Sequence, residues 1–269
     1  MRTATLNAEC IGQIADRLTS AVELRKPIPP IRHLFSPNDI DGAYAVQSEL
    51  TRRRIAAGGR VIGRKIGLTS APVQRQLGVD QPDFGVLFAD MDVTGLAEVP
   101  WNRLLQPKIE AEIAFVLKSD LYAAQARDSE SVMAAVDYAV AALEIVDSRV
   151  QDWNIALTDT VADNASSALF VLSEHRLPLS DFIPREVPMT MYVDGQEVSS
   201  GNGELCLGDP LDALAWLART AADYGDPLRA GQVVLSGALG AMVPAQPGTR
   251  VHADLGPLGL VRASFSEVS

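Results

Sequence analysis

Apolar and polar residues alternate along residues 107–117, which read PKIEAEIAFVL. Because successive side chains of a strand point to opposite faces, this alternation predicts a β-strand. One face carries only apolar side chains, and the other carries Glu110 and Glu112. Two carboxylates on one half-apolar face repel each other and are costly to desolvate. The pattern therefore predicts either a solvent-facing pair of glutamates or a site for a hard divalent cation that offsets this cost.

Apolar residues at helical spacing predict four helices. The first spans residues 11–22, and the second spans residues 36–58 with Ser36 as its cap. A third is predicted through residues 132–143, and a fourth over residues 209–225. The second and the fourth end at glycines, which are common where helices stop.

Most of the remaining chain has the short β-branched and apolar runs that are typical of strands. Asp194-Gly195 separates two of them and is a strong signal for a hairpin turn. Strands that cluster, and do not alternate strictly with helices, favour an α+β fold over a doubly wound parallel sheet. We therefore expect a rolled mixed β-sheet in one body, residues 61–269, with an N-terminal helical region, residues 1–60, packed on it. The runs are residues 61–66, 189–193, 196–198, 232–236, 250–253 and 260–265.

Glu144 is a third carboxylate in an unusual setting, because it is the single charge in the apolar segment 141–146. Such a charge is hard to place at a solvated surface, so it is either ion-paired at a helix-to-strand junction or a ligand. Three acids without a cluster of histidines or cysteines fit Mg²⁺ or Mn²⁺ better than Zn²⁺, which prefers nitrogen and sulfur ligands. Glu110, Glu112 and Glu144 are therefore candidate ligands of one such ion.

The acidic composition argues against several classes of function. The formal net charge is −11 and the sequence pI is about 4.7, so no basic stripe is available to bind nucleic acid. No apolar run approaches the length of a membrane span, and the first residues lack the apolar core of a secretory signal. The two cysteines, Cys10 and Cys206, lie far apart. We therefore expect a reduced, cytoplasmic protein that binds neither nucleic acid nor membrane.

Six segments occur in the order of one family pattern: residues 63–70, 78–87, 106–112, 143–149, 159–167 and 235–238. With them the chain resembles the hydratase/decarboxylase family of the fumarylacetoacetate hydrolase superfamily, over most of its length from about residue 33. The resemblance implies a rolled mixed-sheet catalytic fold and a Mg²⁺ or Mn²⁺ ion bound by Glu110, Glu112 and Glu144. It also implies a homo-oligomer, and an association with other enzymes of the same pathway is a further expectation.

The resemblance implies a reaction in the meta-cleavage catabolism of aromatic or steroid-derived compounds. In it, 2-hydroxypenta-2,4-dienoate (2-keto-4-pentenoate) is hydrated to 4-hydroxy-2-oxopentanoate. Substrates of this 2-oxo/2-hydroxy dienoate class carry a carboxylate beside the C2 oxygen, and the two groups can chelate one divalent ion. Such an ion stabilises negative charge on the C2 oxygen while a proton is delivered at C5 and water adds at C4. The expected partner is therefore a small molecule.

Five residues are candidates for the remaining chemistry. Lys65 would supply the positive charge that an anionic substrate needs, because three ligand carboxylates and a divalent ion sum to −1; otherwise it is a surface lysine. Asp83 would act as general acid/base, since a neighbouring aromatic ring favours a raised pKa; otherwise it is a turn residue after proline. Leu87, Asn164 and Ser166 are candidates for substrate binding, although the two polar residues fit turn positions equally well.

Three other functions stay open. A 4-oxalocrotonate decarboxylase shares the fold and the metal site, but its relatives tend to carry proline between the two ligand glutamates, where this chain has Ala111. The apolar run at residues 84–88 also lacks a cation for a second carboxylate, so we favour hydration of a short monocarboxylate. An acylpyruvate-type C–C hydrolase needs a histidine paired with an acid near the metal, and the three histidines offer no such pair. A non-catalytic protein with a structural Ca²⁺ site would leave Lys65 and Asp83 unexplained.

Overall fold

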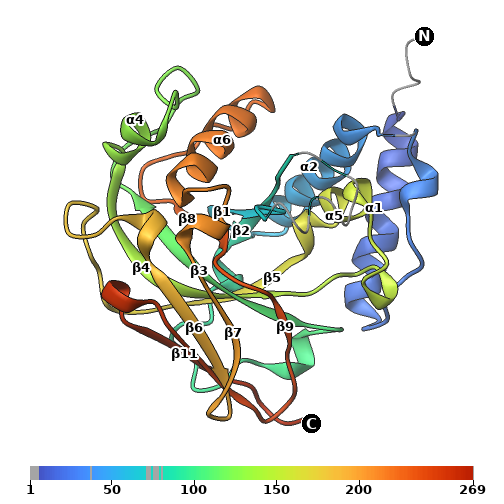
Figure 1. The fold of residues 1–269 in the computed structure, drawn as a ribbon. Coiled ribbons are helices and arrows are strands. Elements are labelled where there is room, and N and C mark those ends of the chain that lie inside the picture. The colour runs from blue at the N-terminus through green and yellow to red at the C-terminus, as the bar shows by residue number, and fades with distance from the viewer. Residues whose placement is uncertain (1–5, 37, 71–73, 75–78, 80, 269) are drawn as a thin grey trace.

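Two β-sheets and a layer of helices make up the computed structural model, which describes residues 6–36, 38–70, 74, 79 and 81–268 (Figure 1). The larger sheet has seven strands in the order β2-β1-β8-β3-β4-β5, with β9 added beside β3. β1 and β8 run parallel, and the other paired strands run antiparallel. The strands are β1 Val61–Gly67, β2 Asp83–Phe88, β3 Lys108–Leu117, β4 Val136–Val146, β5 Ser167–Leu172, β8 Val233–Ala238 and β9 Val243–Pro244.

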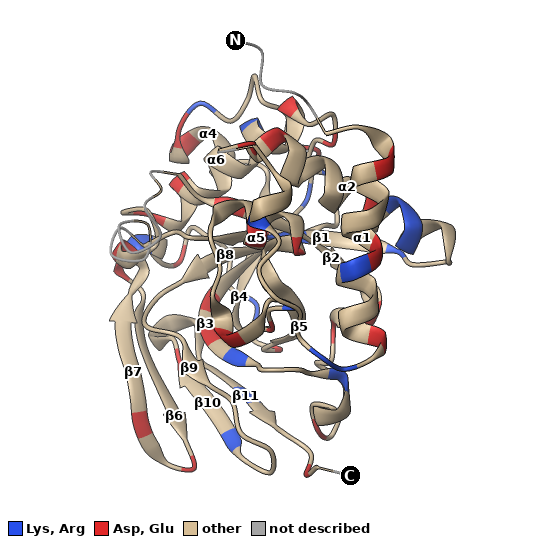
Figure 2. Ribbon diagram, turned by 90° about the vertical axis from the view of Figure 1, so that its right-hand side faces the viewer, with Lys and Arg blue, Asp and Glu red and all other residues tan. Residues whose placement is uncertain are grey.

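The second sheet has four antiparallel strands in the order β11-β10-β6-β7, and Figure 2 shows it below the helices. Ile109 and Ile113 of β3 share one apolar core with Met191 of β6 and Val251 of β10. The apolar face of β3 that the sequence predicts is therefore confirmed, and it packs in the core that joins the two sheets. The strands are β6 Pro188–Val193, β7 Gln196–Asn202, β10 Arg250–Asp254 and β11 Leu260–Ser264.

Three of the four predicted helices form. The first follows Asn7, whose side chain accepts a hydrogen bond from the Cys10 N–H at 2.8 Å. The second begins at Ile40 and not at Ser36, because Asp39 caps it through the Gly42 N–H at 2.9 Å. No helix of the described residues is long and apolar enough to cross a membrane. The α-helices are α1 Ala8–Glu23, α2 Ile40–Ala56, α4 Ser129–Met133, α5 Leu157–Ala162 and α6 Pro210–Asp223, and the 3₁₀ turns include η1 Arg32–Leu34, η2 Ala89–Met91, η3 Trp101–Arg103, η4 Gln151–Trp153, η5 Asn164–Ser166, η6 Pro184–Glu186, η7 Gly203–Leu205 and η8 Gly256–Leu258.

The helix predicted through residues 132–143 is wrong. α4 ends at Met133, and residues 136–146 form the long strand β4. Most of β4 is buried on both faces, so its sequence is a nearly continuous apolar run without alternation. In such a run apolar residues also occur at helical spacing, and periodicity does not separate a helix from a strand. Glu144 consequently lies within a strand, and not at a helix-to-strand junction.

The N-terminal helices are attached to the sheet body through buried polar contacts. The Asp159 carboxylate of α5 is fully buried. It accepts hydrogen bonds from the backbone N–H groups of Ile31 and Arg32 at 2.8 and 2.7 Å, and from Arg32 Nη1 at 2.8 Å. Charge-assisted bonds to a buried carboxylate are among the stronger polar contacts. They hold the segment between α1 and α2 against α5.

Candidate active site

Strand register brings the three glutamates together. Glu110 lies directly opposite Glu144 in the β3–β4 pair, and Glu112 lies opposite Ala142. Because opposite residues of neighbouring strands share a face, all three carboxylates point the same way. One oxygen from each lies within 4.8 Å of the others. Glu112 and Glu144 are 0% exposed and Glu110 is half-buried, so Glu110 and Glu112 are not a solvent-facing pair.

A β-bulge aims a backbone N–H at Glu112. The β3–β8 register shifts between Glu112 and Ala114, so Ser236 and Gly237 together face one residue of β3. The Gly237 N–H donates a hydrogen bond to Glu112 Oε2 at 2.8 Å. Gly237 has a φ of 107°, and an added Cβ would overlap the Thr69 side chain. Only glycine suits this position, and the sequence interpretation missed its role because the bulge depends on pairing between distant strands.

Lys65 lies on the same sheet face as the glutamates. It is opposite Gly85 in β2 and Leu235 in β8, and Leu235 is opposite Ala114 of β3. Its Nζ is 3.2 Å from Glu144 Oε2, and the side chain is 3% exposed. The surface-lysine alternative is therefore wrong, and Lys65 is the cation beside the three carboxylates.

Burial sets the protonation of these groups. It raises the pKa of Glu110 to about 7, against the pull of Lys65 and with added repulsion from Glu144. Burial and the two neighbouring glutamates raise the pKa of Glu112 well above its ordinary value. Burial also raises the pKa of Glu144, although Lys65 lowers it in part. For Lys65, burial lowers the pKa, but the surrounding carboxylates outweigh it and the pKa is raised.

The carboxylate cluster fits a divalent cation. Glu112 Oε1 and Glu144 Oε1 are buried and have no hydrogen-bond partner among the described residues. Three carboxylates against one ammonium leave two negative charges uncompensated, and a divalent ion matches them. Carboxylate oxygens are the ligands that Mg²⁺ and Mn²⁺ prefer. Glu110, Glu112 and Glu144 are thus able to hold one such ion.

We expect Mg²⁺ to bind more weakly at pH 6 than at pH 8. The folded-state pKa of Glu110, about 7, lies above its ordinary value of 4.5, so binding displaces a proton below pH 7. Affinity should then fall by up to about 10-fold per pH unit. Calorimetric titration at three pH values would measure this, with a smaller pH dependence in Glu110→Gln.

The same shift affects the metal-free protein. Between pH 4.5 and 7 the folded state holds a proton on Glu110 that the unfolded state has lost. Stability should therefore fall as the pH rises through this window.

Equal Mg²⁺ affinity at pH 6 and pH 8 would contradict the assignment of Glu110 as a ligand.

Asp83 is the first residue of β2 and is buried. It lies opposite Gly67 at the end of β1. Because Gly67 is two residues after Lys65, Asp83 and Lys65 lie on the same face of the sheet. The Thr160 hydroxyl donates a hydrogen bond to Asp83 Oδ2 at 3.2 Å. Burial raises the pKa of Asp83, although Lys65 and Thr160 lower it in part. The turn-residue alternative is wrong, and the buried acid faces the lysine.

The turn after α5 holds Asn164 and Ser166 in the left-handed backbone region, with φ values of 56° and 52°. The Asn164 amide binds both backbone groups of Val86: Oδ1 accepts from the N–H at 2.7 Å, and Nδ2 donates to the carbonyl at 3.0 Å. The Ser166 hydroxyl donates to Asp163 Oδ2 at 3.3 Å. Leu87 is fully buried in a small apolar cluster. The Asn164 amide therefore anchors β2, and substrate binding by these three residues stays a prediction.

Comparison with known proteins agrees with this geometry. Residues 63–266 match the model described as fumarylacetoacetate (FAA) hydrolase C-terminal. The chain belongs to the fumarylacetoacetate hydrolase family. It is 50% identical over 253 residues to a 2-keto-4-pentenoate hydratase of Paraburkholderia xenovorans, with 94% of each chain covered. It is 48% identical over 263 residues to the TodF product hydratase of Pseudomonas putida, with 98% of each covered.

Solved structures of the fumarylacetoacetate hydrolase family share the fold. The 4-oxalocrotonate decarboxylase from Pseudomonas putida G7, complexed with magnesium and adipate, superimposes with a TM-score of 0.92 at 33% identity, covering 97% of this chain and 99% of that one. A fumarylpyruvate hydrolase from Pseudomonas aeruginosa, in complex with Mn²⁺ and pyruvate, has a TM-score of 0.63 at 16% identity, covering 78% and 90%. The second likeness concerns the fold alone. The expected α+β fold with a rolled mixed sheet and N-terminal helices is confirmed.

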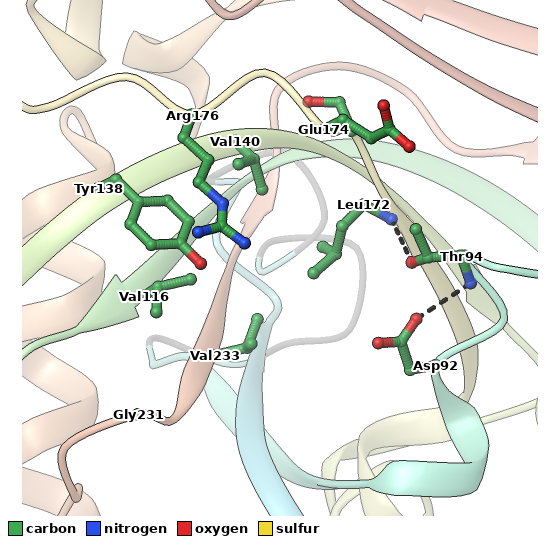
Figure 3. A pocket seen from close by; sticks show the side chains of 11 residues that line it. Asp92, Thr94, Val116, Tyr138, Val140, Leu172, Glu174, Arg176, Gly231 and Val233 are labelled. Atoms are coloured by element: carbon green, nitrogen blue, oxygen red, sulfur yellow. Dashed lines mark hydrogen bonds between the residues drawn. The ribbon is translucent and has the colours of Figure 1, made fainter.

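A separate hollow of about 320 Å³ lies near the end of β3 that is farther from the glutamates. Figure 3 shows the side chains that line it. Val116 lines it, and the Arg176 guanidinium lies 4.6 Å from the centre of the Tyr138 ring. Ala114 lies between Glu112 and Val116 on the same face of β3 and belongs to a buried apolar cluster. The hollow is therefore distinct from the site formed by the three glutamates.

All three histidines lie off the strands that carry the glutamates. His33 is in η1, His175 follows β5, and His252 is in β10 of the second sheet. His252 stacks on Tyr192, with ring centroids 4.8 Å apart. The C–C hydrolase alternative therefore lacks a histidine base on the strands of the site.

Proposed function

We propose that this protein is a metal-dependent hydratase that converts 2-hydroxypenta-2,4-dienoate to 4-hydroxy-2-oxopentanoate in the meta-cleavage catabolism of aromatic or steroid-derived compounds. The observation that carries the proposal is the carboxylate triad, with Glu112 and Glu144 buried and Glu110 half-buried, beside Lys65 and Asp83 on one sheet face. Sequence identity supports hydration, since the relatives at 48–50% identity are hydratases and the decarboxylase structure is at 33%.

Each charged group of the site has a place in this reaction. Glu110, Glu112 and Glu144 would hold a Mg²⁺ or Mn²⁺ ion, which would serve as a Lewis acid for the C2 oxygen. Lys65 neutralises the substrate carboxylate or the enolate that develops from it, and its burial strengthens that interaction. Leu87 lies in β2, and Asn164 and Ser166 lie in the turn beside it. Ser166 binds the substrate carboxylate by turning its hydroxyl away from Asp163.

Asp83 is the general acid/base. Ketonisation of the dienol removes the proton of the C2 hydroxyl and adds one at C5. Hydration then adds a hydroxyl group at C4 and a proton at C3. A carboxyl group with a raised pKa holds a proton closer to neutral pH than an ordinary aspartate does, so it is suited to both transfers.

The experiment that tests the function offers two substrates to the purified protein with Mg²⁺. Freshly generated 2-hydroxypenta-2,4-dienoate should lose its dienol absorbance and yield 4-hydroxy-2-oxopentanoate. 4-Oxalocrotonate should release CO₂ slowly or not at all. Rapid CO₂ release with little hydration would make the protein a decarboxylase. Failure to turn over either substrate, with metal bound, would favour the non-catalytic alternative.

We expect a homo-oligomer in solution. The N-terminal helices and the residue that follows α1 leave large apolar side chains exposed, including Val22, Leu24 and Ile55 at 51%, 75% and 51%, and a partner subunit would bury them. Light scattering should therefore give a multiple of 28.8 kDa. A monomer mass at micromolar concentration would contradict this expectation.

The organisation of the chain follows from the same proposal. We assign residues 61–269 to the catalytic part and residues 1–60 to the helical region, whose described residues contact the catalytic part through Asp159 and Gln47. A cytoplasmic location is supported by the two free cysteines, Cys10 and Cys206.

A further inference from the structure

The two carboxylate oxygens of Asp83 have different surroundings. Oδ2 accepts the hydrogen bond from Thr160 at 3.2 Å, and Oδ1 has no hydrogen-bond partner among the described residues. A Cβ added at Gly67 would overlap Oδ1 and would lie 3.4 Å from the Lys65 ammonium. Oδ1 therefore occupies the space that the missing side chain of Gly67 leaves, close to the Lys65 ammonium.

Gln47 of α2 joins the two elements that carry this pair. Its side chain is buried, and Nε2 donates hydrogen bonds to the Phe84 and Val161 carbonyls, each at 2.9 Å. Phe84 follows Asp83 on β2, and Val161 follows Thr160 on α5. One amide group thus spans β2 and α5 next to the Asp83–Thr160 hydrogen bond. A buried amide with both protons bonded is costly to disturb, so it restricts the separation of the two elements.

Helix packing does not explain the direction of the Thr160 hydroxyl. A threonine within a helix ordinarily returns its hydroxyl to a carbonyl of the preceding turn. The Thr160 backbone N–H bonds to the Ala156 carbonyl in the usual way, yet its hydroxyl reaches a carboxylate on another element. A valine of the same shape would fill the space equally well, so the hydroxyl serves Asp83.

We infer that Thr160 is a positioning residue, which holds Oδ2 of Asp83 so that Oδ1 faces the substrate, and that Gln47 sets the distance over which it does so. The inference rests on the proposed role of Asp83 in proton transfer. It assigns a function in catalysis to the N-terminal helices, because α2 supplies Gln47. Oriented acid/base groups lose rate steeply when they are displaced.

The test compares hydroxyl-free and hydroxyl-bearing variants at position 160. Thr160→Val should lower kcat on the order of 10-fold or more, with little change in KM. Thr160→Ser should restore most of the rate, and Thr160→Ala is a second hydroxyl-free variant should valine disturb the fold. Thr158→Val, at a buried position of the same helix, is the matched control and should behave as wild type. Gln47→Leu should resemble Thr160→Val.

Two further measurements separate positioning from a general structural effect. Mg²⁺ affinity and the inhibition constant of a saturated 2-oxo acid should stay close to wild type in Thr160→Val. A crystal structure of this variant should show the Asp83 carboxylate rotated. Wild-type kcat in Thr160→Val, no recovery in Thr160→Ser, or an unrotated Asp83 would each overturn the inference.

The outcomes also distinguish this inference from the proposed function. If the wild type hydrates the dienoate and Thr160→Val does so equally well, the proposed function stands and the positioning role of Thr160 is refuted. A wild-type protein that does not hydrate the dienoate loses the proposed function, and the Asp83 orientation in the variant structure then decides the inference by itself.

Discussion

Glu112→Gln should abolish tight binding of Mg²⁺ and reduce hydration on the order of 100-fold or more. The substitution keeps the shape of the side chain and removes one of three charges that face the ion. The Gly237 N–H would still find an oxygen acceptor, so the bulge beside it should persist. Calorimetric titration with Mg²⁺ and Mn²⁺ would measure the loss of affinity, and the rate of dienol consumption would measure the loss of activity.

The metal-free fold should tolerate Glu112→Gln, and even gain stability from it. Glu112 is fully buried, and burial raises its pKa well above the ordinary value, so ionising it near neutral pH works against folding. Glu197→Gln, at an exposed position of β7, is the matched control and should leave both affinity and rate unchanged. Chelation of the wild type should remove activity, and Mg²⁺ or Mn²⁺ should restore it. Full activity in a metal-free preparation would contradict the proposal that the reaction depends on a metal ion.

Lys65→Met should lower kcat/KM on the order of 100-fold or more while retaining metal affinity. The ammonium lies 3.2 Å from Glu144 Oε2 and close to the space at Gly67 that Oδ1 of Asp83 occupies. Its charge therefore acts on an anionic substrate and on the enolate, and an ammonium group is not a ligand of the metal ion. Methionine has a similar length and keeps the apolar part of the packing.

Two further variants separate the effect of the Lys65 charge from the effect of its side-chain volume. Lys118→Met, at an exposed position just after β3, should match the wild type. Lys65→Arg keeps the charge but places a larger planar group, so partial activity is expected. Steady-state kinetics together with calorimetric Mg²⁺ titration would measure both quantities. Wild-type kinetics in Lys65→Met, or a loss of metal affinity as large as the loss of rate, would contradict the assignment.

The metal site could be predicted from the sequence because its pattern is local. Alternation along β3 puts Glu110 and Glu112 on one face whatever the rest of the fold does, since side chains of a strand repeat every two residues. Glu144 was recognisable as an isolated charge in an apolar segment. Its position opposite Glu110 could not be predicted, because the β3–β4 register pairs residues that are distant in the sequence.

The same limit explains the error at residues 132–143. A strand that is covered on both faces has no polar side to reveal its period, so β4 had the apolar spacing of a helix. The bulge at Gly237 and the hydrogen bond from Thr160 to Asp83 were also beyond the sequence, for they join segments 125 and 77 residues apart.

The sequence by itself determined which residues are candidates for the chemistry: the glutamates stand out by their local setting, and Lys65 and Asp83 stand out by their place in the segments that resemble the family. The tertiary structure alone decided how they meet. Lys65 is an ordinary strand residue until β1 pairs with β2 and β8. Asp83 is a residue after proline until the fold buries it and brings the Thr160 hydroxyl to it. The physical reason is that alternation and capping act over a few residues, whereas strand register and burial come from the packing of the whole chain.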